Sequence, residues 1–327
     1  MFARTKGRGV SQEEIVLLTA VVLFCAFSFS LNGFLSAGNL VTLVRGVSTL
    51  GILGVGMAIV VIGRGVDLAI VATYAMSAAW TFQLAASGVA IGPAMLLGFV
   101  LALTIGVING VLIAYVEIPA LFATLGMSAL VYGFVRYALV PLYVVYMPPS
   151  AQSVAWIGGG FIAGAPTPIL FFAGVALLGF AFLRYTKYGR FIYAIGDNFA
   201  AARISGAPVR PTIVLQYALS ASIAYVAGMI TATAVSSMNT NVANSSLIYD
   251  VILVVVLGGI GLSGGRGGIR NVLVGTLLIG ILLNGMTIMN IQYTLQNVIR
   301  SLILLAAIVL DSLINPRDEQ TDQQGDI

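Results

Sequence analysis

Histidine is absent from the sequence, and cysteine occurs only once, at Cys25. The absence of histidine excludes imidazole metal ligands, acid–base catalysis by histidine and a histidine proton relay. One cysteine cannot build a disulfide framework or a thiolate metal site. Because the carboxylates are scattered as well, no catalytic constellation can be assembled, and the sequence predicts neither an enzyme nor a bound cofactor.

Charge is also scarce. Charged residues make up 8% of the chain and hydrophobic residues 59%, whereas soluble domains carry about 25% charged residues. The charges leave long apolar gaps, such as those between Asp67 and Glu117 and between Arg136 and Arg184. Hydrocarbon offers the backbone no hydrogen bonds, so these runs must span it as helices, and they lack the alternation of barrel strands. We therefore predict an all-α polytopic membrane protein.

The apolar runs predict about ten transmembrane helices, at about 20 residues per crossing. The expected spans are residues 15–34, 46–63, 68–87, 91–116, 118–135, 154–183, 211–236, 247–263, 271–290 and 296–314. If the glycine-rich turns at 63–67 and 263–270 re-enter the membrane between half-helices, the number falls to eight or nine.

The stretch 184–210 is strongly basic and indicates the orientation. Its charged residues are Arg184, Lys187, Arg190, Arg203 and Arg210 against one acid, Asp197. Positive loops mark the cytoplasmic side, so we expect a cytoplasmic loop here, with six spans before it and four after it. Both termini are then cytoplasmic, and a segment at 1–14 and a disordered tail at 316–327 flank a transmembrane domain at 15–315. The net charge of +4 is dispersed over helix ends, so no nucleic-acid partner is expected.

The two halves of the chain share short patterns. In one pattern Gly106, Asn109 and Gly110 recur as Gly280, Asn284 and Gly285, and in the other residues 60–64 resemble 255–258. With five spans in each half, the odd number predicts an inverted 5+5 repeat. Such repeats are common in transporters and place the solute path at their interface. The alternative is chance similarity between glycine-rich apolar helices.

Four polar residues at membrane depth are candidates for a translocation path, because such residues mark function or a helix end. Arg64 and Asp67 lie three residues apart and would pair on one face if that segment were helical. The alternative is a solvated turn. Asn109 and Asn284 offer amide groups to a solute, although asparagine in a membrane helix more often joins helices together.

A short helix is predicted within the basic loop by residues at its ends. Asp197 or Asn198 can cap its start, and the alanines at 200–202 favour helix. Gly206 supplies a left-handed stop, and Pro208 prevents continuation. A capped two-turn helix is more than a connector needs, so we interpret it as an element that docks into another protein.

The glycine-rich string GGIGLSGGRGG at 258–268 invites comparison with nucleotide-binding loops. A P-loop requires GxxxxGK[ST] after a strand, and no Lys-Ser or Lys-Thr pair follows these glycines. The chain therefore carries no ATPase motif, and ATP-driven transport would need a separate motor subunit.

Four stretches resemble a known family. They are GRGVDLAIVATYAMSAA (63–79), ATLGMSALVYG (123–133), GRFIYAIGDNFAAARISGAPV (189–209) and VVVLGGIGLSGGRGGIRNVLVGTLLIGILLNGM (254–286). They are similar to the membrane permeases of bacterial ribose, galactose and xylose ABC importers, a family that also includes autoinducer-2 and nucleoside permeases. The resemblance implies an ABC importer permease fold in the bacterial inner membrane.

The resemblance also implies partners. These are a cytoplasmic ABC ATPase subunit, a periplasmic solute-binding protein and a second permease copy or paralogue, which gives a homodimer or a heterodimer. The predicted short helix would then be the coupling helix seated in the ATPase. The residues expected to form it are Gly196, Asp197, Asn198, Ala201, Ala202, Arg203 and Gly206.

The chain departs from the usual family pattern at several positions. Arg64 replaces a glycine, Ala69 replaces a serine, and Phe199 and Ala200 replace a Pro-Glu pair. These departures point toward an altered solute path and a heterodimer in which two permeases divide the labour.

The leading prediction is import of a small polar solute by alternating access, with a monosaccharide as the first choice. The alternatives are a nucleoside or autoinducer-2 permease and an ion-coupled secondary transporter. An ion-coupled transporter needs membrane-buried acids, and Asp67, Glu117 and Asp250, all near span ends, are the acids available.

Overall fold

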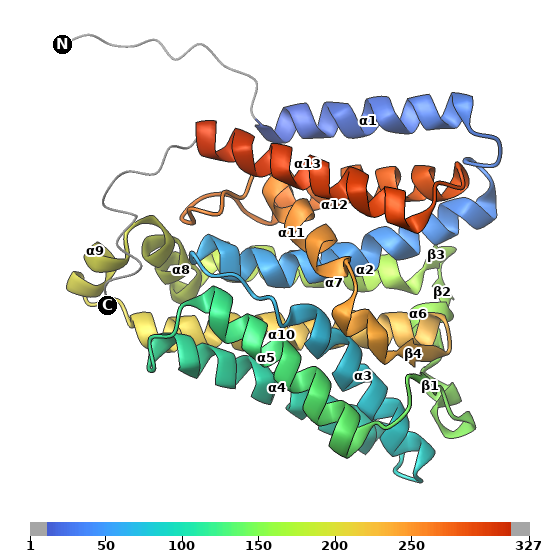
Figure 1. Ribbon diagram of the computed structural model, residues 1–327, viewed down its shortest axis with the longest axis horizontal. Helices are drawn as coiled ribbons and strands as arrows, with labels where there is room; N and C mark the ends of the chain where they lie inside the picture. The colour runs from blue at the N-terminus through green and yellow to red at the C-terminus, as the bar shows by residue number, and fades with distance from the viewer. Residues whose placement is uncertain (1–11, 315–327) are drawn as a thin grey trace.

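The computed structural model describes residues 12–314 as a bundle of helices that run mostly along its long axis (Figure 1). The helices are α1 (Gln12–Ser30), α2 (Ala37–Ile62), α3 (Ile70–Ala86), α4 (Ile91–Ala114), α5 (Ala120–Phe134), α6 (Trp156–Gly159), α7 (Thr167–Tyr185), α8 (Lys187–Asp197), α9 (Phe199–Ile204), α10 (Val209–Ala234), α11 (Leu247–Leu257), α12 (Ile269–Ile288) and α13 (Tyr293–Ile314). Shorter elements are the π-helical turn η1 (Val135–Leu139) and the 3₁₀ helices η2 (Pro149–Val154) and η3 (Thr240–Asn244). The predicted tail at 316–327 lies outside the described residues, as does the predicted N-terminal segment except for residues 12–14, which begin α1.

Seven helices in the described part of the chain are long and apolar enough to cross a membrane. They are α1, α2, α4, α5 with its continuation η1, α7, α10 and α12. α3 has 17 residues and α11 has 11, so neither reaches the about 20 residues of a full crossing. The multi-pass, all-α architecture is confirmed, whereas the number of ten spans is not.

The predicted span at 154–183 was placed too early, because its helix α7 begins only at Thr167. The residues before it form α6 and a hairpin of β2 (Phe161–Ile162) and β3 (Ala165–Pro166). Pro166 and Pro168 explain this boundary, since proline is tolerated in the first turn of a helix and not in its interior.

The bundle has two distinct ends in Figure 1. α8 and α9 lie at one end together with the start of α1 and the far end of α13, and we call it the α9 end. At the opposite end, the ribbon end, β1 (Val144–Tyr146) pairs antiparallel with β4 (Ser237–Asn239). The first and last described helices therefore have their outer termini on the same side of the bundle.

α2 and α10 form the centre of the bundle. Each has 26 residues, they run in opposite directions, and they pack against each other. α10 also packs against α3 and α4, while α2 packs against α11 and α12. In the same way α3 contacts α5 and α11 contacts α13. These matching contacts are those of an inverted repeat that relates α2–α5 to α10–α13. α1 and α7 do not follow it, because α1 packs against α12 and α7 packs against α2.

One of the two shared sequence patterns falls on equivalent helices of this repeat, α4 and α12. A Cβ on Gly106 would collide with the carbonyl oxygen of Tyr217 on α10, and a Cβ on Gly280 would collide with Val47 on α2. Both glycines therefore permit close approach to a central helix. The other pattern, 60–64 and 255–258, falls at the ends of α2 and α11, which are not equivalent in this packing.

Candidate functional site

Two glycine-rich turns from different halves of the chain meet within the bundle. The first glycine turn, residues 63–69, links α2 to α3, and the second glycine turn, residues 258–268, links α11 to α12. The N–H of Gly265 donates to the carbonyl oxygen of Ile62 at 2.8 Å. The last carbonyl group of α2, which lacks a partner inside the helix, is in this way bound by the second glycine turn.

Arg64 links the same two turns through its side chain. It has a left-handed backbone, with φ of 68°, so the first glycine turn is not helical here, and the condition under which Arg64 would pair with Asp67 is not met. The Nε of Arg64 instead donates to the carbonyl oxygen of Ser263 at 3.2 Å. A glycine would adopt this backbone without strain, so the arginine trades backbone strain for a contact between the turns.

Asp67 is buried at the start of α3, with 2% of its surface exposed. Its Oδ1 accepts from the N–H of Ala69 at 3.1 Å, and its Oδ2 accepts from the hydroxyl of Ser220 on α10 at 2.7 Å. The positive end of the helix dipole also favours a carboxylate here. Asp67 therefore holds α3 against α10, and its part in a translocation path stays a prediction.

Asn109 and Asn284 lie in matching helices but in different surroundings. Asn284 Nδ2 donates to Asn39 Oδ1 at 2.8 Å and Asn39 Nδ2 donates to Asn284 Oδ1 at 3.0 Å, which joins α12 to α2. Asn109 is 1% exposed, and its Oδ1 has no partner. The third residue of α2 is Asn39, but the third residue of α10 is Pro211, which offers no side-chain amide. A path role for either asparagine stays a prediction.

The predicted short helix is present as α9. Asn198 caps it, since its Oδ1 accepts from the N–H of Ala201 at 2.9 Å, and Asp197 is instead the last residue of α8. Gly206 follows the helix with φ of 81°, the predicted left-handed stop. α8 itself was not predicted, although Thr186 marks its start by accepting from the N–H of Gly189 at 3.0 Å.

α9 has one buried side and one open side. Ala202 is buried against Ile195 and Val209 and anchors the helix to its neighbours. Ala201 and Arg203 are exposed, and Ile204 is 88% exposed. The open side therefore presents small and apolar groups next to one positive charge.

The end of α8, just before α9, packs against the last residue of α2 and against the second glycine turn. A Cβ on Gly196, near the end of α8, would collide with the carbonyl oxygen of Ile62 and with the N–H group of Gly265. Nearby, the hydroxyl of Tyr193 donates to the carbonyl oxygen of Gly267 at 2.8 Å. A displacement of α8 and α9 would therefore act directly on the contact between the end of α2 and the second glycine turn.

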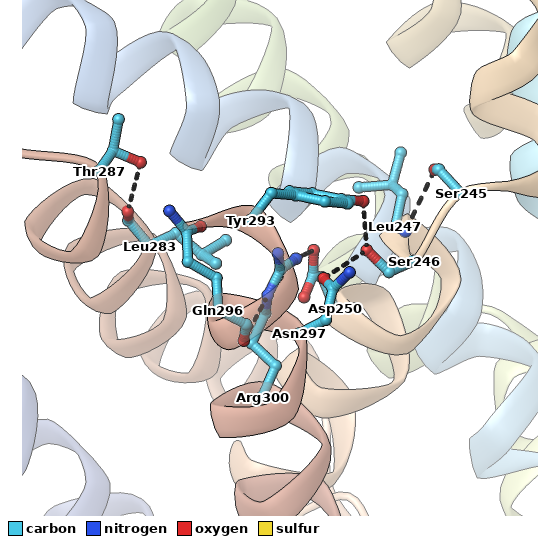
Figure 2. A network of polar contacts seen from close by, with 10 residues as sticks. All are labelled: Ser245, Ser246, Leu247, Asp250, Leu283, Thr287, Tyr293, Gln296, Asn297 and Arg300. Atoms are coloured by element: carbon cyan, nitrogen blue, oxygen red, sulfur yellow. Dashed lines mark hydrogen bonds and ion pairs between the residues drawn. The ribbon is translucent and has the colours of Figure 1, made fainter. Parts of the chain in front are cut away.

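A buried ion pair near the ribbon end was missed by sequence reasoning. Arg300 on α13 donates to Asp250 on α11 at 2.6 Å, and their side chains are 8% and 6% exposed (Figure 2). The two residues are 50 positions apart, so no local spacing connects them. The available signal was that each is an isolated charge within an apolar run.

These features are those of a multi-pass membrane protein. The bundle has seven membrane-length helices among its described residues, and no cluster of metal-binding side chains occurs among residues 12–314. The chain belongs to the family of permease components of branched-chain amino acid transport systems, whose sequence model matches residues 39–308. The resemblance to transport permeases is thereby confirmed.

Several relatives are permease proteins similar to this chain over most of its length. The ribose import permease protein RbsC of Escherichia coli (strain K12) is 31% identical over 92% of this chain and 94% of its own. RbsC of Bacillus subtilis (strain 168) is 32% identical over 93% and 94%. The galactofuranose transporter permease protein YtfT of Escherichia coli (strain K12) is 28% identical over 84% and 80%. No solved structure matches the chain.

Proposed function

We propose that this chain is the permease subunit of an ABC importer that moves a monosaccharide across the bacterial inner membrane by alternating access. The relatives named for ribose and galactofuranose transport support the substrate class. The matching family is described as the permease component of branched-chain amino acid transport systems, so an amino acid is the second candidate for the solute. The 31% identity with RbsC over 92% of this chain favours a sugar over an amino acid as the solute.

The proposed orientation places the α9 end in the cytoplasm. Five basic residues of the stretch 184–210 lie on or beside α8 and α9, as expected for a cytoplasmic face. Both termini are then cytoplasmic, a separate ABC ATPase binds at the α9 end, and a periplasmic solute-binding protein delivers solute at the ribbon end. A second permease, identical or paralogous, completes the pore.

The observation that carries this proposal is the pair of contacts made by the segment around α9. Its outer side is an exposed, capped helix with Ile204 at its tip, which suits docking into a motor subunit. Its inner side, at Gly196, packs against Ile62 at the end of α2 and against Gly265 of the second glycine turn. ATP binding can drive transport only by favouring one pore state over another, and this segment connects the motor surface to the turns that would differ between states.

The test is the substitution Ala201→Asp in the assembled transporter. An acidic residue in the first turn of a helix is compatible with its dipole, and the cap contact uses the backbone of Ala201, so α9 should still form. The exposed face would now carry a charge where an apolar surface docks. We expect normal membrane insertion but loss of sugar uptake and of sugar-stimulated ATP hydrolysis.

Ala194→Asp is the matched control, because Ala194 is an exposed alanine on α8, outside the docking segment. It should leave uptake close to that of the unmodified transporter. Normal uptake by correctly inserted Ala201→Asp protein would refute the coupling role. Uptake by the purified permease without any ATPase subunit would refute the ABC importer function itself.

A further inference from the structure

A polar network lies between the half-helix α11 and the helix α13, near the ribbon end. Around the Asp250–Arg300 pair, the hydroxyl groups of Ser246 and Tyr293 are 2.8 Å apart, and Ser246 also donates to Asn297 Oδ1 at 3.1 Å. Figure 2 shows the Asp250 carboxylate directed at the Arg300 guanidinium, with Asn297 and Ser246 on its other side. Charges and amides are thus concentrated in a region otherwise built of apolar side chains.

The network is incomplete at one atom. Asp250 is 4% exposed, and its Oδ2 binds Arg300, but its Oδ1 is buried without any hydrogen-bond partner. An ionised carboxylate accepts several hydrogen bonds, and buried polar groups without partners are rare in folded proteins. A donor group from outside the described chain would complete the site.

The groups around this atom are suited to hydroxyls and not to charges. Asp250 and Arg300 neutralise each other, and Ser246, Tyr293 and Asn297 are neutral donors and acceptors. Ser246 and Asn297 are partly exposed and Tyr293 is 59% exposed, so a solute can reach these three residues from the surface, and a side-chain movement would then bring it to the buried Oδ1 of Asp250. Asp250 is the fourth residue of α11, which places it about 5 Å along the helix from its start.

The geometry points to a binding site for a neutral, polyhydroxylated solute at Asp250, Ser246, Asn297 and Arg300. Oδ1 of Asp250 accepts a solute hydroxyl, and the serine and the asparagine hydrogen-bond to its neighbours on the ring. This inference rests on the proposed function and adds to it the place where the monosaccharide first contacts the permease. Because Asp250 lies on the short helix α11, the same contacts would also couple solute binding to the position of α11.

The experiment uses a thiol probe at Ser246 in the complete transporter, reconstituted in vesicles. Cys25, the one native cysteine, is first replaced by serine, and Ser246→Cys then introduces a near-isosteric thiol. A membrane-impermeant thiol reagent is applied on the ribbon side with D-ribose, D-galactose, D-xylose or L-leucine. A bound sugar at about ten times its dissociation constant leaves roughly a tenth of the sites free and slows labelling about tenfold.

Asn244→Cys is the matched control, because Asn244 is exposed in the same segment and lies outside the network. It should be labelled at one rate with or without sugar. In the Ser246→Cys protein, the further substitution Asp250→Asn should abolish protection by sugar.

Three results would overturn the inference. One is unchanged labelling of Ser246→Cys by a sugar that the unmodified transporter takes up, and another is protection by L-leucine alone. The third is full sugar protection in the Asp250→Asn protein together with a lower unfolding temperature, which would make the ion pair a structural link between α11 and α13. If the unmodified transporter takes up none of the sugars, the proposed function fails instead.

Discussion

The guanidinium Nε of Arg64 lies 3.2 Å from the carbonyl oxygen of Ser263, a residue 199 positions later in the chain. Together with the bond from Gly265 to Ile62, this contact fastens the two glycine turns to each other. The two glycine turns therefore share one junction, and the end of α8, which leads into α9, packs against it at Ile62 and Gly265. Four predictions follow from the contacts at this junction and in the helices around it.

Substitutions at Arg64 should separate backbone strain from side-chain bonding. Arg64→Ala loses the bond to Ser263 but keeps the left-handed backbone, so the free energy of unfolding should fall by about 1.5 kcal/mol. Arg64→Gly loses the same bond but removes strain of roughly 1 kcal/mol. Thermal unfolding in detergent should rank the glycine variant between the alanine variant and the unmodified protein. A glycine variant less stable than the alanine variant would show that φ of 68° is not strained here.

The partner of Asp67 can be identified by double-mutant cycles. Asp67 binds Ser220, not Arg64, so Asp67→Ala and Ser220→Ala should show a coupling energy on the order of 1 kcal/mol. The cycle of Asp67→Ala with Arg64→Ala should give a smaller value. Unfolding midpoints of the single and double variants provide the measurement. The opposite ranking would restore the ion pair expected from the sequence.

Gly196 should tolerate no side chain. Alanine at this position would press its Cβ on Ile62 and Gly265, and overpacking of this kind costs about 1–3 kcal/mol. We expect lower thermal stability and lost uptake. Gly46→Ala is the control, because nothing lies within 4 Å of the added Cβ and alanine in a helix interior stabilises by about 0.5–1 kcal/mol. Equal thermal stability and uptake of the two variants would exclude close packing of Gly196 against Ile62 and Gly265.

The reciprocal amide pair of Asn39 and Asn284 should behave as a link between helices. Asn284→Ala removes both amide bonds but leaves Asn39 Nδ2 its bond to the carbonyl oxygen of Phe34 at 2.7 Å, so stability should fall by about 1 kcal/mol. Adding Asn39→Ala removes that remaining bond and should lower stability by about 1 kcal/mol more. Uptake per folded molecule should stay the same in both variants. A large loss of uptake with unchanged stability would instead place Asn284 in the solute path.

The general architecture could be predicted because it follows from composition. Scarce charge and long apolar runs leave only helices as spanning elements. The short helix α9 was also predictable, because Asn198, the alanines and Gly206 act within a few residues of one another. The true extent of α7 was less accessible, since the apolar residues before Thr167 fit a span by composition and the prolines alone mark its start.

The contacts that join distant segments could not be read from local spacing. Arg64 and Asp67 lie three positions apart, and that spacing predicts a pair only in a helix. The left-handed backbone of Arg64 interrupts any helix there. Asp250 and Arg300 come from separate helices, so their pairing depends on how α11 and α13 pack. The seat of Gly196 likewise requires the positions of three segments at once.

The cap of Asn198 on α9 also determines how a partner would bind there. With its first turn closed and Ala202 anchored, the segment is ordered before any encounter. Association then loses little conformational entropy at this surface, unlike recognition by segments that fold only on contact. The affinity of such a complex would depend on the shape complementarity of the two surfaces. Substitution of single exposed side chains of α9 could change its dissociation rate without changing the backbone of the segment.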